Sequence, residues 1–198
     1  GVNTGRLGFL ASFTKEEIFK QLDEVLRGDI NISKRSVIEV VQPKGDFFPY
    51  ALNDITISRR ETTSMITVDS QLDDEFLNIF WGDGLIVSTP SGSTAYSLSA
   101  YGPLIMPQCR NMLLTPIAPH SLTMRPLVLP EDLSVEMTVT ARNNTFLLVL
   151  DGQTKILPTG VKVRVQKSQS QLRIVHLRPY CFADTLRRKL LWGAPVRE

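Results

Sequence analysis

The sequence is poor in the residues that build metal centres, disulfide frameworks and membrane spans. It contains two cysteines, Cys109 and Cys181, and two histidines, His120 and His176. The cysteines lie far apart and outside any CxxC or Cys/His grouping, so no zinc site is expected. We expect both to be buried free thiols in a reducing compartment, the cytoplasm. No apolar run approaches the roughly 18 residues of a membrane span, and the first residues do not resemble a secretion signal.

The sequence also lacks an excess of charge of one sign. Its 22 Lys and Arg against 20 Asp and Glu leave a formal net charge of +2. A nucleic-acid-binding protein usually concentrates basic residues on one face, so this balance argues against such a partner. The tightest basic group, residues 187–189, falls near the end of an expected helix, where cations interact favourably with the helix dipole.

Helical patterns stand at the two ends of the chain. Residues 14–28 begin with a capping box, in which Thr14 and Glu17 each satisfy a backbone N–H of the other. Apolar residues then recur at helical spacing on one face, and Gly28 is suited to end the helix. A second helix is expected at 182–192, before Gly193. The opening segment GVNTGRLGFL (1–10) resembles the end of a strand that continues into a loop.

Between residues 36 and 177 the apolar residues recur at every second position. This alternation predicts strands with one face on a core and one face in water. Turn signals separate them, among them residues 142–144, 151–152 and 158–160. The expected strands are 36–41, 51–59, 64–70, 75–80, 84–88, 134–142, 145–150, 161–166 and 171–177. Many short strands without intervening helices predict an antiparallel sandwich or barrel-like domain and argue against a doubly wound sheet.

The segment DGLIVSTPSGSTAYSLS (83–99) is the densest chemical signal. An apolar strand breaks at Pro90 and Gly92 and enters a short helix, which Ser93 or Thr94 would cap. Such a loop presents N–H groups and hydroxyls suited to a phosphate or ribose. A plain strand-to-helix turn explains the pattern equally well. The segment is neither a P-loop nor a Rossmann fingerprint, and no GxSxG elbow is present.

Two further polar segments are ambiguous. Asn53 and Asp54 stand early in an expected strand, where an amide and a carboxylate together could meet ribose hydroxyls, although Asn and Asp are also common at turns. Asp151, Gly152 and Gln153 follow an apolar run, and Asp-Gly at this place is typical of a hairpin turn.

Taken together, these segments resemble the bacterial NAD kinases. The matching segments are GVNTGRLGFL (1–10), ALNDITISR (51–59), DGLIVSTPSGSTAYSLSA (83–100), LTPIAPHSLTMRPLVLP (114–130), LDGQ (150–153) and TLRRKLLWG (185–193). The resemblance implies a mainly β fold: an antiparallel, sandwich-like C-terminal domain, with flanking helices that belong to an incomplete N-terminal α/β domain. The implied division is the end of the α/β domain at 1–30, the all-β NAD-binding domain at 31–177, and a C-terminal helix at 178–198 that packs back on the first domain.

The resemblance also implies a reaction and a set of contacts. Family members transfer a phosphoryl group from ATP, or polyphosphate, to the 2′-hydroxyl of the adenosine ribose of NAD, with Mg²⁺ or another divalent cation. They are usually homodimers or homotetramers. By position, the NAD contacts would be Asn53, Asp54, Asp83, Thr94, Ala95, Tyr96, Ser97, Ser99, Asp151 and Gln153. The sequence departs from the family pattern at Asp54, where Glu is usual, at Ser91, where Thr is usual, and at Tyr101 and Trp81.

The family's Gly-Gly-Asp-Gly-Thr motif, which carries the catalytic Asp, is absent from this sequence. We therefore expect a truncated NAD kinase that is inactive by itself, with no catalytic residue or metal ligand in this chain. Its end helices should expose apolar faces and favour association. Two alternatives are a non-catalytic dinucleotide-binding or oligomerisation module and, as a weaker one, a lipid kinase of the same superfamily.

Overall fold

The computed structural model describes residues 2, 9–10, 13–61 and 63–193. Most of the segment expected at 1–10, and residues 194–198 at the end of the chain, lie outside these residues. The chain forms two compact units, one of residues 1–35 with 172–198 and one of residues 36–171. Strands β1 (Asn31–Gln42) and β12 (Lys162–His176) contain the boundaries between them.

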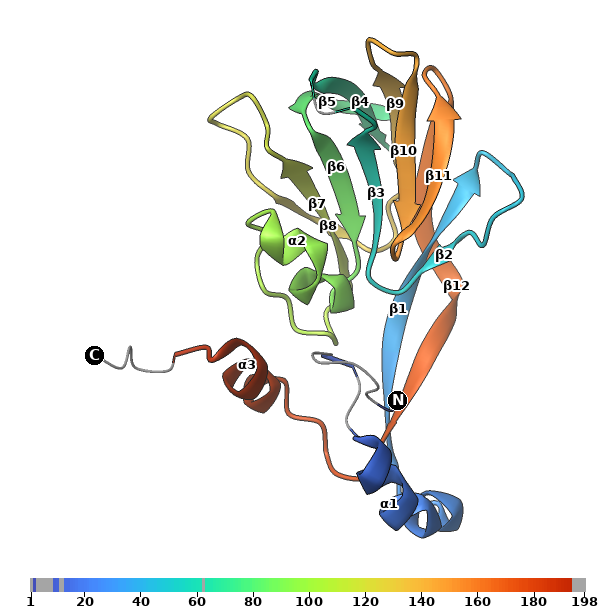
Figure 1. The fold of residues 1–198 in the computed structure, drawn as a ribbon, viewed down its shortest axis with the longest axis vertical. Helices are drawn as coiled ribbons and strands as arrows, with labels where there is room; N and C mark the ends of the chain where they lie inside the picture. The colour runs from blue at the N-terminus through green and yellow to red at the C-terminus, as the bar shows by residue number, and fades with distance from the viewer. Residues whose placement is uncertain (1, 3–8, 11–12, 62, 194–198) are drawn as a thin grey trace. The chain divides into compact units, whose positions relative to one another are not determined.

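The larger unit is built from antiparallel strands (Figure 1). One sheet has the order β2-β1-β12-β9-β4-β5 and the other β11-β10-β3-β6-β7-β8. Besides β1 and β12, the strands are β2 (Tyr50–Ala51), β3 (Asp54–Arg59), β4 (Ile66–Leu72), β5 (Glu75–Gly82), β6 (Gly84–Ser88), β7 (Asn111–Ile117), β8 (Leu127–Pro130), β9 (Val135–Thr140), β10 (Thr145–Leu150) and β11 (Gln153–Pro158). This arrangement confirms the predicted antiparallel, mainly β fold.

One hydrophobic core collects the inward-facing residues of both sheets. Phe146 and Leu148 of β10 are fully buried, as the period-two alternation of that strand requires. Leu85 of β6 is also fully buried, in a strand whose residues are all buried. Burying one such side chain stabilises the fold by about 1.5–3 kcal/mol. The core therefore fixes the strand register, because a slip of one residue would turn every apolar side chain outward.

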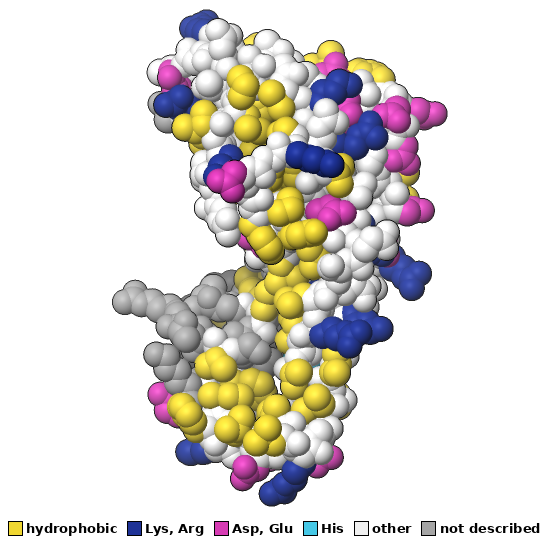
Figure 2. Space-filling model, turned by 90° about the vertical axis from the view of Figure 1, so that its right-hand side faces the viewer, with side chains coloured by type: hydrophobic (Ala, Val, Ile, Leu, Met, Phe, Trp, Pro, Cys, Tyr) yellow, Lys and Arg dark blue, Asp and Glu magenta, His cyan; other side chains and the backbone are white. Residues whose placement is uncertain are grey.

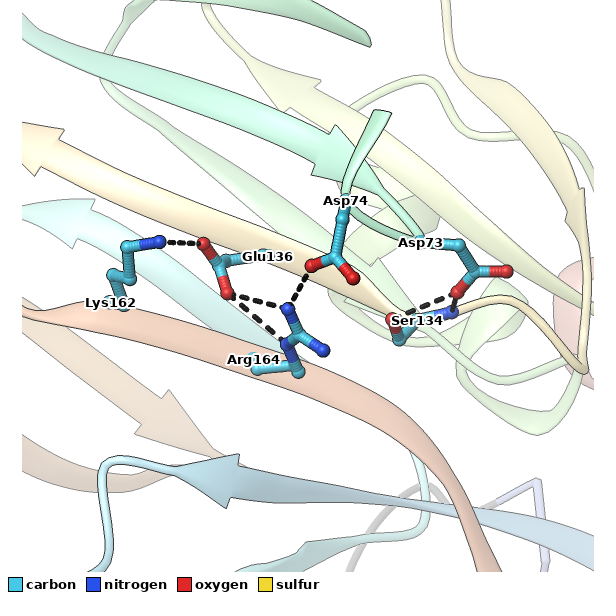
Figure 3. A network of polar contacts seen from close by, with 6 residues as sticks. All are labelled: Asp73, Asp74, Ser134, Glu136, Lys162 and Arg164. Carbon is cyan, nitrogen blue, oxygen red and sulfur yellow. Dashed lines mark hydrogen bonds and ion pairs between the residues drawn. The ribbon is translucent and has the colours of Figure 1, made fainter. Parts of the chain in front are cut away.

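A network of hydrogen bonds and ion pairs links β9 to β12 on the outside of this core (Figure 3). Glu136, buried in β9, accepts hydrogen bonds from Lys162 Nζ at 2.6 Å and from Arg164 Nη2 at 2.9 Å. Arg164 also pairs with Asp74. The hydrogen bond from Lys162, followed by that from Arg164, lowers the pKa of Glu136 despite its burial. The carboxylate is therefore held in its charged form.

The turn between β4 and β5 is held by a second contact in the same view. Asp73 and Asp74 have φ of 44° and 70°, the left-handed conformation that a tight hairpin turn requires. The Asp73 carboxylate accepts hydrogen bonds from the backbone N–H and the hydroxyl of Ser134, at 2.8 and 2.9 Å. These two bonds lower the pKa of Asp73 and tie the turn to the start of β9.

The smaller unit contains α1 (Lys15–Arg27) and α3 (Phe182–Leu190). The capping box of α1 is confirmed: Glu17 N–H donates to Thr14 Oγ1, and Thr14 N–H donates to Glu17 Oε2. Gly28 ends the helix at φ 86°, as predicted. The apolar face is open, since Phe19 is 81% and Leu26 75% exposed. Figure 2 shows hydrophobic side chains gathered in the region where α1 lies in Figure 1.

Several sequence-based expectations were wrong in detail. Residues 161–166 and 171–177 do not form two strands but one, β12, because the residues between them include no Gly, Pro, Asn or Asp to make a turn. The strands β2, β7, β8 and β11 were not predicted. In β7 the cause is a nearly continuous buried run, which shows no alternation. Both cysteines are exposed and not buried. Helix α3 ends at Leu190, with Leu191 as its C-cap at φ 53°, two residues before the expected end at residue 192.

Candidate functional site

The candidate site lies where three segments of the larger unit meet at one end of the second sheet. Strand β3 pairs with β6 so that Asp54 lies opposite Ser88, and with β10 so that Ile55 lies opposite Leu150. The bend before β3, the segment after β6 and the β10–β11 turn are thereby brought together, although they lie as much as 99 residues apart in sequence. The pairing of β3 explains why segments that are separate in the sequence form one site.

Asn53 and Asp54 occupy this end, but Asn53 precedes the strand, contrary to the prediction of a strand from residue 51. Leu52 and Asn53 form a bend, and β3 begins at Asp54. The side chain of Asp54 is buried, at 7% exposure, and accepts a hydrogen bond from Thr56 Oγ1 at 3.2 Å. Asn53 is half-buried, and its side-chain amide makes no hydrogen bond with the residues that the structure describes. An amide with no hydrogen bond to the described residues and a buried carboxyl group thus stand on consecutive residues at this end of the sheet.

Burial raises the pKa of Asp54 to about 6. The hydrogen bond from Thr56 acts in the opposite direction, and the nearby charge of Asp151 adds to the rise. A carboxyl group with this pKa is largely ionised at pH 7.5 and accepts hydrogen bonds from ligand hydroxyls. Its ionised form is poorly solvated, so a ligand that donates hydrogen bonds to it replaces solvation that the fold has removed.

Asp151 and Gly152 form the predicted hairpin turn between β10 and β11, with φ of 45° and 86°. Asp151 is exposed, and its carboxylate accepts hydrogen bonds from the backbone N–H groups of Leu52, Asn53 and Asp54. It therefore reaches the site through the backbone of the neighbouring segment. Gln153, the first residue of β11, is exposed.

The segment after β6 forms a 3₁₀ turn, η1 (Ser91–Thr94), followed by the short helix α2 (Tyr96–Ser99). Neither Ser93 nor Thr94 caps a helix, contrary to the prediction. The hydroxyls donate instead to carbonyls one turn earlier, Ser93 Oγ to Pro90 O at 2.7 Å and Thr94 Oγ1 to Ser91 O at 3.2 Å. In so tight a turn the carbonyl three residues back is the nearest acceptor.

Gly92 brings this turn against the bend at Asn53. A Cβ atom on Gly92 would lie 2.0 Å from the Asn53 carbonyl oxygen, closer than any side chain permits. A glycine is needed here for close approach and not for a left-handed backbone, because its φ is not in that region. The contact brings the segment that contains Thr94 and Ala95, both half-buried, to the same end of the sheet as Asn53.

The remaining loop residues differ in orientation. Tyr96 and Ser99 are exposed and free to meet a ligand. Ser97 is fully buried, and its hydroxyl lies 2.9 Å from Thr115 Oγ1 of β7. Gly102 lies against the same hydroxyl, where a Cβ atom would come within 2.1 Å. The contact between Ser97 and Thr115 thus holds α2 against the second sheet.

Asp83 lies away from the other predicted contacts. Register places residue 84 opposite Ser58 and Ser88 opposite Asp54, so Asp83 stands roughly 17 Å from Asp54 at about 3.4 Å per residue. Asp83 forms an ion pair with Arg59 at 2.9 Å. The structure therefore does not join Asp83 to the site at the other end of these strands, and its role in binding stays a prediction.

One residue of the site was not predicted from the sequence. Thr89 is fully buried, and its hydroxyl donates to the Leu52 carbonyl at 2.6 Å and accepts from Gly92 N–H at 3.1 Å. In the sequence, Thr89 stands between an apolar strand and Pro90, a pattern typical of the end of a strand. Only the pairing of β3 with β6 reveals its partners.

Three other features bear on which functions the fold supports. Within residues 2, 9–10, 13–61 and 63–193, no group of three or more His, Cys, Asp or Glu could hold a metal ion. No helix there is long and apolar enough to cross a membrane. The smaller unit has a hollow of about 720 Å³, lined by residues of α1, α3 and the segment 176–181. It contains none of the predicted site residues.

Comparison with known protein families identifies residues 52–177 as an ATP-NAD kinase C-terminal domain. An NAD kinase of Porphyromonas gingivalis is 52% identical over 197 residues, which cover 100% of this chain and 68% of that protein. An NAD kinase of Cytophaga hutchinsonii is 41% identical over 200 residues, with the same coverage.

Solved structures show the same fold. The chain matches a yeast NADH kinase complexed with NADH at a TM-score of 0.88 and 28% identity, covering 99% of this chain and 59% of that one. It matches an NAD kinase from Archaeoglobus fulgidus in complex with ATP at a TM-score of 0.81 and 27% identity, covering 96% and 72%. The chain thus spans less than two thirds of the yeast enzyme.

Proposed function

This chain belongs to the NAD kinase family, and from that premise we propose that it provides the NAD-binding part of an NAD kinase. The reaction would transfer the terminal phosphoryl group of ATP, or of polyphosphate, to the 2′-hydroxyl of the adenosine ribose of NAD. The oxygen of that hydroxyl forms the new P–O bond, the bond to the leaving ADP (or to the shortened polyphosphate) breaks, and the hydroxyl proton is released.

The observation that carries this proposal is the convergence at one end of the second sheet. The backbone of Asn53, the residue before the buried Asp54, lies against Gly92 of η1. Thr94 and the exposed Tyr96 follow Gly92 closely in the chain. A carboxylate and an amide are suited to the two hydroxyls of a ribose, and an aromatic face suits a planar base. The complexes of the similar structures, with NADH and with ATP, support the same ligand class.

These residues would bind and orient NAD. Phosphoryl transfer depends mainly on positioning and on neutralising the phosphate charge. The sequence contains no Gly-Gly-Asp-Gly-Thr motif, and we propose that this chain alone does not transfer the phosphoryl group. A divalent cation would accompany ATP and neutralise phosphate charge. The described residues offer no cluster of His, Cys, Asp or Glu side chains to hold it.

A second function, a dinucleotide-binding module without catalysis, is favoured by one observation. Asn53, Asp54, Asp151 and the segment 89–99 all lie in the larger unit, so the candidate contacts do not require residues of the smaller one. No feature of the site favours a lipid kinase. The cytoplasmic location and the division at residues 30 and 177 stay predictions.

We further propose that the protein is a homodimer or homotetramer. Strand β5 is an edge of its sheet, and Phe76, Ile79 and Trp81 on it are each about half or more exposed. An exposed apolar edge strand invites pairing with another chain. The ring of Trp81 stacks with that of His120, with centroids 4.3 Å apart, which holds the indole at the surface.

The proposed binding is tested by calorimetric titration of NAD, NADP and ATP into the chain. We expect saturable NAD binding by the wild type, weakened at least about tenfold in Asn53→Ala, because two amide hydrogen bonds to a ligand are lost. Asn143→Ala is the matched control, since Asn143 is exposed in the turn at the opposite end of β10. Equal affinity of both variants would refute the assignment of the site.

An activity assay then distinguishes the two proposed functions, part of an NAD kinase and a dinucleotide-binding module without catalysis. The chain and the full-length Porphyromonas gingivalis NAD kinase are assayed for NADP formation with ATP and Mg²⁺. Binding without turnover by the chain, beside turnover by the relative, is the expected result. NADP formation by the chain itself would contradict the proposed lack of transfer.

A further inference from the structure

The bend at Leu52 and Asn53 and the first residue of β3, Asp54, form a short segment with an unusual backbone environment. Each of the three residues has one N–H and one carbonyl to satisfy. All six groups are satisfied by two residues, Asp151 and Thr89. No regular strand partner supplies them for Leu52 and Asn53, which lie outside the paired strands.

The carboxylate of Asp151 accepts hydrogen bonds from all three backbone N–H groups. Its Oδ2 accepts from Leu52 at 2.7 Å, and its Oδ1 accepts from Asn53 at 2.9 Å and Asp54 at 3.0 Å. The N–H of Asp151 donates to the Asp54 carbonyl at 3.1 Å. Both carboxylate oxygens are thus committed to backbone N–H groups, and these charge-assisted bonds are stronger than neutral ones.

Thr89 donates hydrogen bonds to the two remaining backbone carbonyls of the segment. Its hydroxyl donates to the Leu52 carbonyl at 2.6 Å, and its N–H donates to the Asn53 carbonyl at 2.9 Å. The same hydroxyl accepts from Gly92 N–H at 3.1 Å. Thr89 therefore joins the bend to the 3₁₀ turn that contains Thr94.

We propose that Asp151 and Thr89 are positioning residues, which hold the backbone of Leu52 to Asp54 so that the side chains of Asn53 and Asp54 face NAD in a fixed geometry. Asp151 acts on the ligand through this backbone, to which both of its carboxylate oxygens are hydrogen-bonded. The inference rests on the proposed function only for the identity of the ligand. Preorganisation of this kind raises affinity because the segment loses no freedom on binding.

Asp151→Asn is a suitable test variant, because Asn adopts the left-handed conformation at φ 45° without strain. Its amide nitrogen cannot accept a hydrogen bond. Asp73→Asn is the matched control. Asp73 has a similar φ of 44° and also accepts a backbone N–H, that of Ser134, but it lies in the β4–β5 turn.

The first measurement needs no ligand. Hydrogen exchange of the Leu52, Asn53 and Asp54 amides should accelerate about tenfold or more in Asp151→Asn, and not in Asp73→Asn. Thr89→Val should loosen the same segment, and Thr89→Ser, which keeps the hydroxyl, should restore it. Unchanged exchange in Asp151→Asn, or equal behaviour of the Val and Ser variants, would overturn the inference.

The second measurement is a double-mutant cycle on NAD affinity. Asp151→Asn should weaken NAD binding about tenfold in the wild-type background, and by less than about twofold when Asn53→Ala and Asp54→Asn are also present, because the groups it positions are gone. An undiminished effect would mean direct contact with NAD and would refute positioning. If the wild type binds no NAD, the proposed function fails, and hydrogen exchange alone decides whether these residues hold the segment.

Discussion

Replacing Asp54 by Asn should stabilise the folded protein at neutral pH. The buried carboxyl has a pKa of about 6, raised from the ordinary value of 3.8. The folded state therefore binds its proton more tightly than the unfolded chain does. Below pH 3.8 the carboxyl is protonated in both states and ionisation costs nothing. As pH rises from 3.8 to 6 the unfolded chain ionises first, so stability falls, and above pH 6 the whole cost is present.

The size of this cost follows from the two pKa values. A rise from 3.8 to about 6 corresponds to about 3 kcal/mol, a large share of the roughly 5–15 kcal/mol that stabilise a typical domain. Asn has the same shape and keeps an oxygen for the Thr56 hydroxyl. We expect Asp54→Asn to raise the free energy of unfolding by up to about 3 kcal/mol at pH 7.5, or the midpoint by roughly 6–12 °C.

Urea unfolding of the wild type and Asp54→Asn at intervals from pH 4 to pH 7.5 measures this effect. The two curves of stability against pH should separate across the range 3.8 to 6 and run parallel above it. Asp132→Asn, at an exposed position, should leave the wild-type curve unchanged in shape. A constant difference between wild type and Asp54→Asn, or a destabilised variant at pH 7.5, would refute the argument from burial. The same variant should bind NAD more weakly, which would show that the buried charge is retained for binding.

Three other substitutions test the core, the site and the assembly. Leu148→Ala should lower the free energy of unfolding by about 2–5 kcal/mol, while Ile156→Ala, at an exposed position on the neighbouring strand, should change it by about 0.5 kcal/mol or less; urea titration compares them. Gly92→Ala should disrupt the site, because its Cβ would meet the Asn53 carbonyl at 2.0 Å; loss of NAD binding measures this, and wild-type affinity would contradict it. Ile79→Lys on the exposed edge strand should reduce the mass in light scattering if copies meet there, and an unchanged oligomer would exclude that edge.

Features that depend on neighbouring residues were predicted well from the sequence. The capping box of Thr14 and Glu17, the end of α1 at Gly28, and the strands β6 and β10 were confirmed. Their signals are hydrogen bonds within one turn, an apolar run in β6 and an alternation of buried and less buried residues in β10. The Asp151–Gly152 turn could likewise be predicted, because both residues adopt the left-handed conformation that this hairpin turn requires.

The site could be predicted only as a list of segments. The family resemblance pointed to Asn53, Asp54 and Asp151. It did not show that the Asp151 carboxylate accepts hydrogen bonds from the backbone of the other two. It also grouped Asp83 with them, whereas the register of β3 and β6 separates Asp83 from Asp54. Ser97, which the resemblance names as an NAD contact, is buried against Thr115 in the fold, and its role in binding stays a prediction.

The sequence by itself thus determined which elements form, because helix caps, turn residues and the alternation of apolar side chains act over a few residues. The tertiary structure alone decided what those elements bring together. The burial that raises the pKa of Asp54, the close approach of Gly92 to Asn53 and the two hydrogen bonds of the Thr89 hydroxyl all depend on strand pairing. Pairing is set by packing the two sheets on one core, a condition that no local stretch of sequence contains.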